Sequence, residues 1–443
     1  MTTEKVHVGI DIGTTSAKIC AKKGKDVIFE SKRVYETDEK ESENGIQNTK
    51  LILNTVIGLL KTIREKIENE NLEISDIWTC GQMHGIVFWD QDSIEKLDFL
   101  NTSSLYNWTY STPNLQNFLK TLPKWNSGEI HPGFGLFTLA YLNNSSPDSL
   151  KKYNRCGTIM DLFLTYLTQN SKCFMSQHNA FSWGYCNSDY TWQPEIQKFL
   201  PNWIELPTIT QGNSKVVGTW NGISCHVASG DLQASVASLD SFEKTAYIII
   251  GTSAQLCCLV DSNQLSTTVL PSTVVQLPYS DSQKLIAACS MNGGNALESI
   301  LKGKTRKCCA TNADNNFSSD RLCQLLVELD NIVPRLPTNL KIDPIFIPER
   351  GVSKALSIQN VRSDTTDLQI LEATHEGIIN NLFSLFPVSL LFTLNIKTIA
   401  LVGSSQSTRF RRHIESVIDA NFEVITSASA ISTPAGAINF SKI

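Results

Sequence analysis

The sequence lacks an apolar run long enough to cross a membrane. Among its 443 residues the longest apolar stretch lies near 383–394, and Ser384, Pro387 and Ser389 interrupt it. A helix that spans a bilayer needs about 20 mostly apolar residues. The opening residues Met-Thr-Thr-Glu-Lys also lack the apolar segment of a signal peptide. We therefore expect a cytoplasmic protein with no membrane partner.

Positive charge is scarce as well. Lys and Arg together number 38 against 43 Asp and Glu, which gives a net charge of −5 and a pI near 5.9. This balance excludes a broadly basic surface, so we expect no nucleic-acid partner. The 12 cysteines contain neither a CxxC pair nor a zinc-ligand spacing. They are therefore predicted to be reduced, mostly buried thiols.

What the sequence does have is a strand, a small-sided turn and a second strand at residues 10–20. Such a turn presents backbone N–H groups and hydroxyls, which suit a phosphate, although an ordinary hairpin has the same pattern. Asp11 precedes the turn, where its carboxylate could hold a hydrated magnesium ion. The residues predicted to bind phosphate are Gly13, Thr14, Thr15, Ser16 and Lys18.

A second copy of this pattern occupies residues 248–257 and is one position shorter. It contains Gly251 and Thr252, but Ile249 stands where the first copy has Asp11. A repeat near half the chain length indicates two duplicated domains. We place them at 1–240 and 241–443, the first with an insertion at about 101–214. Two such turns could grip a polyphosphate in a cleft, with the metal ligand on one side only.

Periodicity predicts the coarse organisation of both halves. Apolar residues at spacings of three and four predict an amphipathic helix over about 53–67. Residues 36–47 and the Asn/Asp/Ser-rich segment 312–319 are predicted to be surface loops. A small basic cluster on a predicted helix, made of Arg409, Arg411 and Arg412, is interpreted as a solvated face. The resulting order of strands and helices predicts an α/β fold.

Asp231 is the candidate catalytic carboxylate. It follows Gly230 and opens a helix-like run. There it could accept the proton of a sugar hydroxyl as that oxygen attacks phosphorus. The alternative is a plain helix N-cap, which is a common use of Asp in this context.

Further candidates lie at predicted strand ends and helix starts. Gln82, Met83 and His84 follow a strand, where ligands bind in open α/β sheets, and their polar tips suit a hydroxylated substrate. Glycine-rich entries to two helices offer flat backbone for a nucleotide, although glycine there can also serve backbone geometry alone. The candidate nucleotide contacts are Gly293, Gly294, Gly403 and Ser404.

Taken together, the motifs resemble the FGGY carbohydrate kinases. The motifs that carry the resemblance are residues 10–18, 81–89, 182–185, 230–236, 251–253, 292–295 and the region around 403. The resemblance covers about residues 6–440. It implies two duplicated domains of the actin/hexokinase type, which is a ribonuclease H-like fold, with a cleft between them.

The resemblance also implies ATP-dependent, Mg²⁺-dependent phosphorylation of a ketose. The motifs are most similar to those of members acting on sedoheptulose, which would give the 7-phosphate. In that comparison Asp231 matches the general base, Asp11 the magnesium-associated carboxylate, and Met83 and His84 sugar contacts. The expected partners are thus a small-molecule sugar and ATP, with the chain a monomer or homodimer.

One departure from the family pattern concerns the sugar. After Trp108 the family has an acidic residue and then Arg, whereas this chain has Tyr110 and Thr112. Loss of a charged hydrogen bond costs about 1.5–3 kcal/mol, so altered sugar binding is expected. Two alternatives therefore stay open: a catalytically weakened sugar- or nucleotide-binding paralogue, and a kinase for another ketose or polyol such as xylulose or glycerol.

Overall fold

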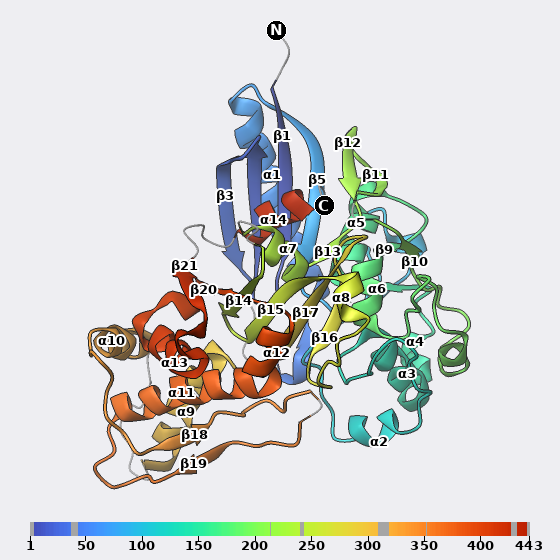
Figure 1. Cartoon of the computed structure of the whole chain (residues 1–443). Coiled ribbons are helices and arrows are strands. Elements are labelled where there is room, and N and C mark those ends of the chain that lie inside the picture. The colour runs from blue at the N-terminus through green and yellow to red at the C-terminus, as the bar shows by residue number, and fades with distance from the viewer. Residues whose placement is uncertain are drawn as a thin grey trace. The chain divides into compact units, whose positions relative to one another are not determined.

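The structure is a computed structural model that describes residues 4–36, 43–212, 214–239, 243–308, 319–350, 352–426 and 432–440. The chain divides into two compact units. The first unit comprises Met1–Leu239, Pro278–Ser280 and Ile431–Ile443, and the second comprises Asp240–Leu277 and Asp281–Ala430. Figure 1 shows their helices and strands and labels many of them.

The first unit is built on a mixed sheet with the strand order β11-β12-β5-β1-β2-β3, and β13 also pairs with β5. Its strands are β1 (Lys5–Ile12), β2 (Ser16–Lys23), β3 (Asp26–Val34), β5 (Glu73–Gly81), β11 (Val216–Trp220), β12 (Ile223–His226) and β13 (Ser229–Gly230). Smaller two-stranded sheets are formed by β4 (Ile46–Gln47) with β7 (Leu105–Tyr106), β6 (Val87–Trp89) with β8 (Arg155–Gly157), and β9 (Phe174–Ser176) with β10 (Thr208–Thr210).

Helices of the first unit lie on both faces of this main sheet and in the segment between β7 and β11. They are α1 (Thr49–Asn69), α2 (Leu115–Leu119), α3 (Gly135–Ser145), α4 (Pro147–Leu150), α5 (Ile159–Thr168), α6 (Gln177–Trp183), α7 (Asp231–Ala237) and α14 (Thr433–Phe440). Helix α1 confirms the predicted amphipathic helix, because its apolar positions are buried in one core with β1, β2 and β5. The Asn48 side chain caps it by accepting from Leu51 N at 3.1 Å.

Residues of β1 alternate between the two faces of the sheet. Val8, Ile10 and Ile12 join the core under α1. Gly9 faces α14, and a Cβ there would meet Pro434 O at 2.0 Å, so glycine permits the close approach of this helix. Figure 1 shows α14, in red, against the blue strands β1 and β5. Asp11 shares the parity of Gly9 and therefore points to the α14 side.

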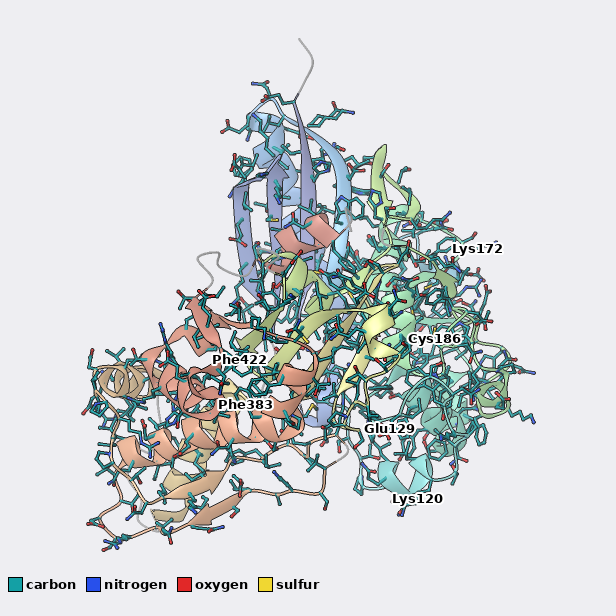
Figure 2. All side chains as sticks on the ribbon, in the orientation of Figure 1. Lys120, Glu129, Lys172, Cys186, Phe383 and Phe422 are labelled. Carbon is teal, nitrogen blue, oxygen red and sulfur yellow. The ribbon has the colours of Figure 1, made fainter. Side chains whose placement is uncertain are left out.

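The second unit has a six-stranded sheet with the order β16-β17-β15-β14-β20-β21. Its strands are β14 (Thr245–Ile250), β15 (Ala254–Asp261), β16 (Val275–Pro278), β17 (Gln283–Ser290), β20 (Thr398–Gly403) and β21 (Glu423–Thr426), and a separate hairpin pairs β18 (Lys341–Asp343) with β19 (Ser357–Gln359). Its helices are α8 (Ser262–Leu265), α9 (Gly294–Cys308), α10 (Ser319–Asp330), α11 (Asp367–Leu385), α12 (Val388–Thr393) and α13 (Thr408–Ile418). Phe383 and Phe422, labelled in Figure 2, belong to its core.

The two units repeat one another. The strands β1, β2, β3, β5 and β12 correspond in pairing and direction to β14, β15, β17, β20 and β21. Helices α1 and α11 occupy the same place in the two orders, before the strand that pairs in parallel with the first. The predicted α/β fold of two duplicated domains is confirmed.

The interpretation of the arginine cluster on α13 as a solvated face is wrong for two of its three members. Arg409 pairs with Asp330 of α10, and Arg412 pairs with Glu372 of α11, which is only 1% exposed. Arg411 does face solvent and pairs with Glu415 one turn along at 2.7 Å. Arg409 and Arg412 therefore tie α13 to its neighbouring helices.

The prediction of a loop at 36–47 is also wrong at its end, because Ile46 and Gln47 form β4 and Gln47 is buried. Most of the predicted 312–319 loop lies outside the described residues. Of the ten cysteines whose side chains are described, eight are buried, as predicted, while Cys289 is half-buried and Cys323 is exposed. Within the described part of the chain, no helix combines the length and apolarity that a membrane crossing needs.

Candidate functional site

Three neighbouring strands of the first unit end side by side. In the parallel register, Ile12 of β1 lies opposite Gly81 of β5, and Gly81 lies opposite Gly230 of β13. The next residues along the chain are Gly13, Gln82 and Asp231. Because the carboxyl ends of parallel strands meet at one edge, the fold brings the predicted phosphate turn, sugar loop and base together.

The first turn, residues 13–16, is closed by backbone hydrogen bonds. Gly13 N donates to Ser16 O at 3.1 Å, and Tyr35 N donates to Thr15 O at 3.1 Å. Ser16 is buried, Thr14 is half-buried and Thr15 is exposed. The turn is therefore fixed at its base while its middle stays accessible to a ligand.

Asp11 and Lys18 face each other across the β1–β2 hairpin that carries this turn. Lys18 Nζ lies 3.2 Å from Asp11 Oδ2. The Asp11 side chain is 3% exposed, and burial raises its pKa while the Lys18 charge opposes that shift. Its second oxygen, Oδ1, is buried and has no hydrogen-bond partner among the described residues.

The orphaned Asp11 oxygen fits a magnesium ion of the kind that proteins bind through one or two carboxylates plus phosphate and water. The described residues contain no cluster of three or more His, Cys, Asp or Glu side chains arranged to hold a metal. Asp11 would thus supply a single ligand.

Asp231 is the first residue of α7, and Gly230 rather than Asp231 is its N-cap. The side chain is partly buried. Its pKa is raised to about 7, first by desolvation and then by the negative charge of Asp11, while Lys18 and the backbone N–H of Leu232 act in the opposite direction. A carboxyl group with such a pKa can exchange a proton near neutral pH, which a general base must do.

The predicted sugar loop, residues 82–84, follows β5 and is held in an unusual backbone conformation. His84 has a φ of 74°, in the left-handed region that costs a non-glycine residue about 1 kcal/mol or more. Its Nδ1 lies 2.6 Å from Ser182 O, and its ring stacks on Phe134 with centroids 4.6 Å apart. Met83 packs against Gly230, where a Cβ would meet its sulfur at 2.6 Å. These contacts fix the loop beside Asp231.

Side-chain amides connect the sugar loop to the phosphate turn. Gln82 Nε2 donates to Gln47 Oε1 at 3.2 Å, and Gln47 Nε2 donates to Thr14 O at 2.7 Å. Trp108 Nε1 donates to Thr14 Oγ1 at 2.9 Å. Sequence reasoning missed Gln47, because a polar residue in a polar stretch gives no sign of burial.

The second turn, residues 251–253, meets the start of α9 within the second unit. Gly251 N donates to Ser253 O at 2.9 Å, Gly294 N to Gly251 O at 2.8 Å and Asn295 N to Thr252 O at 3.2 Å. A Cβ at Gly293 would meet the Ser253 carbonyl carbon at 2.5 Å, so the two segments touch through backbone. The structure thus brings the candidates Gly251, Thr252, Gly293 and Gly294 together.

Gly403 ends β20 opposite Ile250, in the position that Gly81 takes in the first unit. Its φ of 69° favours glycine, and a Cβ there would meet Ile250 O at 3.0 Å. Ser404 opens the short 3₁₀ turn that follows. The buried Ser405 fixes this turn by accepting from Val402 N at 2.7 Å.

A buried carboxylate supports the start of α9. Glu349, 5% exposed, accepts hydrogen bonds from Ser290 Oγ, Met291 N, Asn292 Nδ2 and Asn381 Nδ2 at 2.7–2.9 Å. Sequence reasoning missed Glu349 because Pro-Glu-Arg carries no local pattern. Four donors on one carboxylate fix the segment that leads into Gly293.

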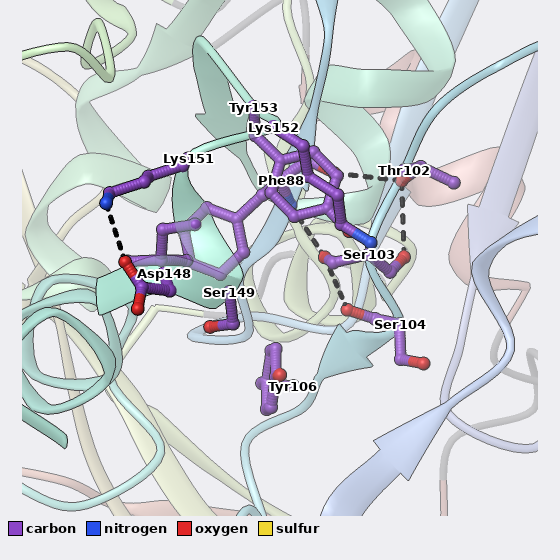
Figure 3. Close-up of a pocket in the computed structure, with 11 residues that line it drawn as sticks. Phe88, Thr102, Ser103, Ser104, Tyr106, Asp148, Ser149, Lys151, Lys152 and Tyr153 are labelled. Carbon is purple, nitrogen blue, oxygen red and sulfur yellow. Dashed lines mark hydrogen bonds and ion pairs between the residues drawn. The ribbon is translucent and has the colours of Figure 1, made fainter. Parts of the chain in front are cut away.

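A hollow of about 700 Å³ lies elsewhere in the first unit, as Figure 3 shows. Thr102 Oγ1 donates to Phe88 O at 3.0 Å, Ser103 Oγ donates to Ser104 O at 2.7 Å, and Lys151 pairs with Asp148 at 2.7 Å. Most of its polar groups are therefore already engaged, and its lining shares no residue with the strand-end site.

Similarity to characterised proteins is extensive. The sedoheptulokinases of Mus musculus and Homo sapiens are 28% and 27% identical to this chain over 440 and 443 residues, covering 92% of this chain and 91% of each relative. The fold matches that of a xylulose kinase from Lactobacillus acidophilus with a TM-score of 0.77 and 19% identity, covering 99% of this chain and 89% of that one. It also matches Plasmodium falciparum glycerol kinase, solved with ADP, with a TM-score of 0.74 and 17% identity over 98% of this chain and 88% of that one.

The profile of the N-terminal domain of the FGGY family of carbohydrate kinases matches residues 6–227. That range spans half of the chain and includes the first turn, its acidic residue and the sugar loop. The chain therefore belongs to the FGGY family of carbohydrate kinases.

Proposed function

We propose that this carbohydrate kinase transfers the γ-phosphoryl group of ATP to the terminal hydroxyl of sedoheptulose, giving sedoheptulose 7-phosphate. The similarity to two sedoheptulokinases over 92% of the chain supports the choice of sugar. The observation that carries the chemistry is Asp231, a carboxyl group with a pKa of about 7 at a strand end shared with the first turn and the sugar loop.

In this mechanism Asp231 accepts the proton of the attacking sugar hydroxyl as the O–P bond forms and the bond to ADP breaks. Thr14, Thr15 and Ser16 would donate hydrogen bonds to phosphate oxygens, and Lys18 would add a positive charge near them. Magnesium, when bound, would neutralise charge on the phosphates, with Asp11 as its protein ligand.

The sugar would contact the loop of Met83 and His84, which the structure fixes beside Asp231. In the second unit, the nucleotide would contact the backbone around Gly251, Gly293 and Gly403. The flat surface of glycine backbone suits a close approach of this kind.

A second candidate is a catalytically weakened paralogue, and the two positions after Trp108 that differ from the family, Tyr110 and Thr112, favour it. Tyr110 is 6% exposed and packs edge-on against Tyr106, with ring centroids 4.9 Å apart. Thr112 Oγ1 lies 3.1 Å from Tyr141 Oη. Neutral groups that already have partners thus replace the acidic and arginine residues typical of the family.

An ADP-release assay with sedoheptulose, xylulose and glycerol distinguishes these proposals. We expect sedoheptulose to give the highest kcat/KM, and ³¹P NMR to place the product phosphate on the terminal carbon. Faster turnover with xylulose or glycerol would assign a different sugar. ATP binding without turnover on any of the three would establish the weakened paralogue instead.

A further inference from the structure

The Gln47 side chain bridges two segments that have different predicted ligands. Its Oε1 accepts from Gln82 Nε2 at 3.2 Å, at the start of the sugar loop. Its Nε2 donates to Thr14 O at 2.7 Å, in the phosphate turn. Gln82 Nε2 also reaches Gly13 O, at 3.4 Å. A shift of either segment therefore strains hydrogen bonds to the other.

Gln47 itself has little freedom to move. It lies in β4, paired with Leu105 of β7, and the residue is only 8% exposed. The next residue, Asn48, caps α1, and Thr49 Oγ1 donates to Ser103 O at 2.8 Å. A short strand and a helix start thus anchor the amide from both sides.

Trp108 sets the direction of the Thr14 hydroxyl. Its indole N–H donates to Thr14 Oγ1 at 2.9 Å, so that oxygen acts as the acceptor in this pair. A hydroxyl that accepts in this way keeps its own hydrogen for another acceptor. Thr14 is half-buried on a turn that remains accessible, so a phosphate oxygen can take that hydrogen.

We propose that Gln47 is a positioning residue that couples the sugar loop to the phosphate turn, so that each substrate strengthens the binding of the other. This inference rests on the proposed function for the identity of the two ligands. Ordering of the Gln82 loop by sugar fixes the Gln47 amide, which holds Thr14 in the position that receives phosphate. The coupling is reciprocal, because linkage requires each ligand to change the affinity of the other by the same factor.

The test compares nucleotide affinity with and without sugar. Titration calorimetry measures the Kd of the magnesium complex of a non-hydrolysable β,γ-imido ATP analogue, first alone and then with saturating sedoheptulose. We expect sugar to tighten nucleotide binding about fivefold to tenfold in the wild type, which is the size of one buried hydrogen bond. In Gln47→Leu, which removes both amide contacts at similar volume, we expect this ratio to fall to about 1.

Thr49→Val is the matched control. It removes a partly buried hydrogen bond two residues away, to Ser103 O, without touching the turn or the loop. We expect it to keep the wild-type ratio even if its stability falls. Loss of the ratio in this control would overturn the inference, because general loosening of β4 would then explain the effect. An unchanged ratio in Gln47→Leu, or a wild-type ratio near 1, would overturn it as well.

Gln47→Glu keeps the test decisive if the leucine variant does not fold. It preserves the acceptor toward Gln82 but places an oxygen against the Thr14 carbonyl, and we expect the ratio to be lost there too; a retained ratio would contradict the inference. These binding ratios do not depend on turnover. If the wild type turns over sugar but the Gln47 variants keep the wild-type ratio of nucleotide affinities, only the coupling is rejected. If the wild type turns over none of the sugars, the proposed function is rejected.

Discussion

The two strand-turn-strand segments, residues 10–20 and 248–257, share a backbone design but differ in charge. Both join antiparallel strands and both lie beside a parallel strand that ends in glycine, Gly81 or Gly403. At equivalent positions the first has the pair Asp11 and Lys18, whereas the second has Ile249 opposite Gln255. The two turns thus share their strand pairing, while the charged pair is present in the first turn only. Catalytic chemistry is therefore expected of the first unit, and neutral backbone contacts of the second.

The buried side chains that hold the two turns in place also differ in charge. Neutral amides, Gln47 and Gln82, hold the first turn next to its charged pair. A buried carboxylate, Glu349, holds the segment next to the uncharged second turn. Beside the first turn, a third carboxylate next to Asp11 and Asp231 would repel a bound phosphate. The second turn has no carboxylate at the position of Asp11, so the charge of Glu349 is not added to another one there.

The largest effect that tests this contrast is expected from Asp231→Asn. It removes the proton acceptor while keeping the shape of the side chain, and we expect kcat to fall about 10³-fold with little change in nucleotide Kd. Steady-state kinetics and calorimetry measure the two quantities. The exposed Asp148→Asn serves as control and should behave as wild type. Wild-type turnover in Asp231→Asn would exclude this residue as the base.

A slightly smaller loss is expected when the first turn is made to resemble the second. Asp11→Ile removes the proposed magnesium ligand, and kcat should fall at least about 10²-fold because metal charge stabilisation is worth several kcal/mol. The magnesium dependence of turnover should also weaken. Ile249→Val, at the equivalent position of the second turn, should leave turnover within about twofold of wild type. Similar losses of kcat in Asp11→Ile and Ile249→Val would contradict the assignment of the catalytic charge to the first unit.

Local pattern was sufficient to predict the repeated hairpins and an amphipathic helix over about 53–67, which the structure extends to Thr49–Asn69, because strand alternation and helical periodicity depend on near neighbours in the sequence. It also placed Asp231 at a helix start. It failed for the buried Gln47 and Glu349 and for the half-buried Arg412, whose polar partners lie far away in the chain. A polar side chain in a polar segment looks the same whether water or a distant partner satisfies it. The supports of a site are thus harder to predict than its glycine turns.

An intermediate effect is expected in the second unit from Glu349→Gln. The amide offers one acceptor oxygen where the carboxylate has two, and it turns an N–H₂ group toward existing donors. We expect the free energy of unfolding to fall by about 2–3 kcal/mol and KM for ATP to rise severalfold, with KM for sugar unchanged. Urea denaturation and steady-state kinetics measure these changes. Glu415→Gln, which breaks only the exposed pair with Arg411, should change stability by less than about 0.5 kcal/mol. An equal rise in both KM values would argue against a role confined to the nucleotide.

The smallest effect concerns stability, because ionisation of Asp231 in the first unit lowers the free energy of unfolding. The folded-state pKa of Asp231, about 7, lies above its ordinary value of 3.8, so the folded protein holds this proton more tightly than the unfolded chain does. Stability from this group is therefore complete below about pH 4 and is lost as pH rises through 7. Asn does not titrate, so Asp231→Asn should be more stable than wild type at pH 8 and keep only part of that advantage at pH 5, which still lies above the ordinary pKa of 3.8. Even one pKa unit of this shift is worth about 1.4 kcal/mol, which urea denaturation at the two pH values resolves. An advantage that is equal at both pH values would show that the carboxyl group is not held in its neutral form, and would remove the electrostatic reason for treating Asp231 as a base poised near neutral pH.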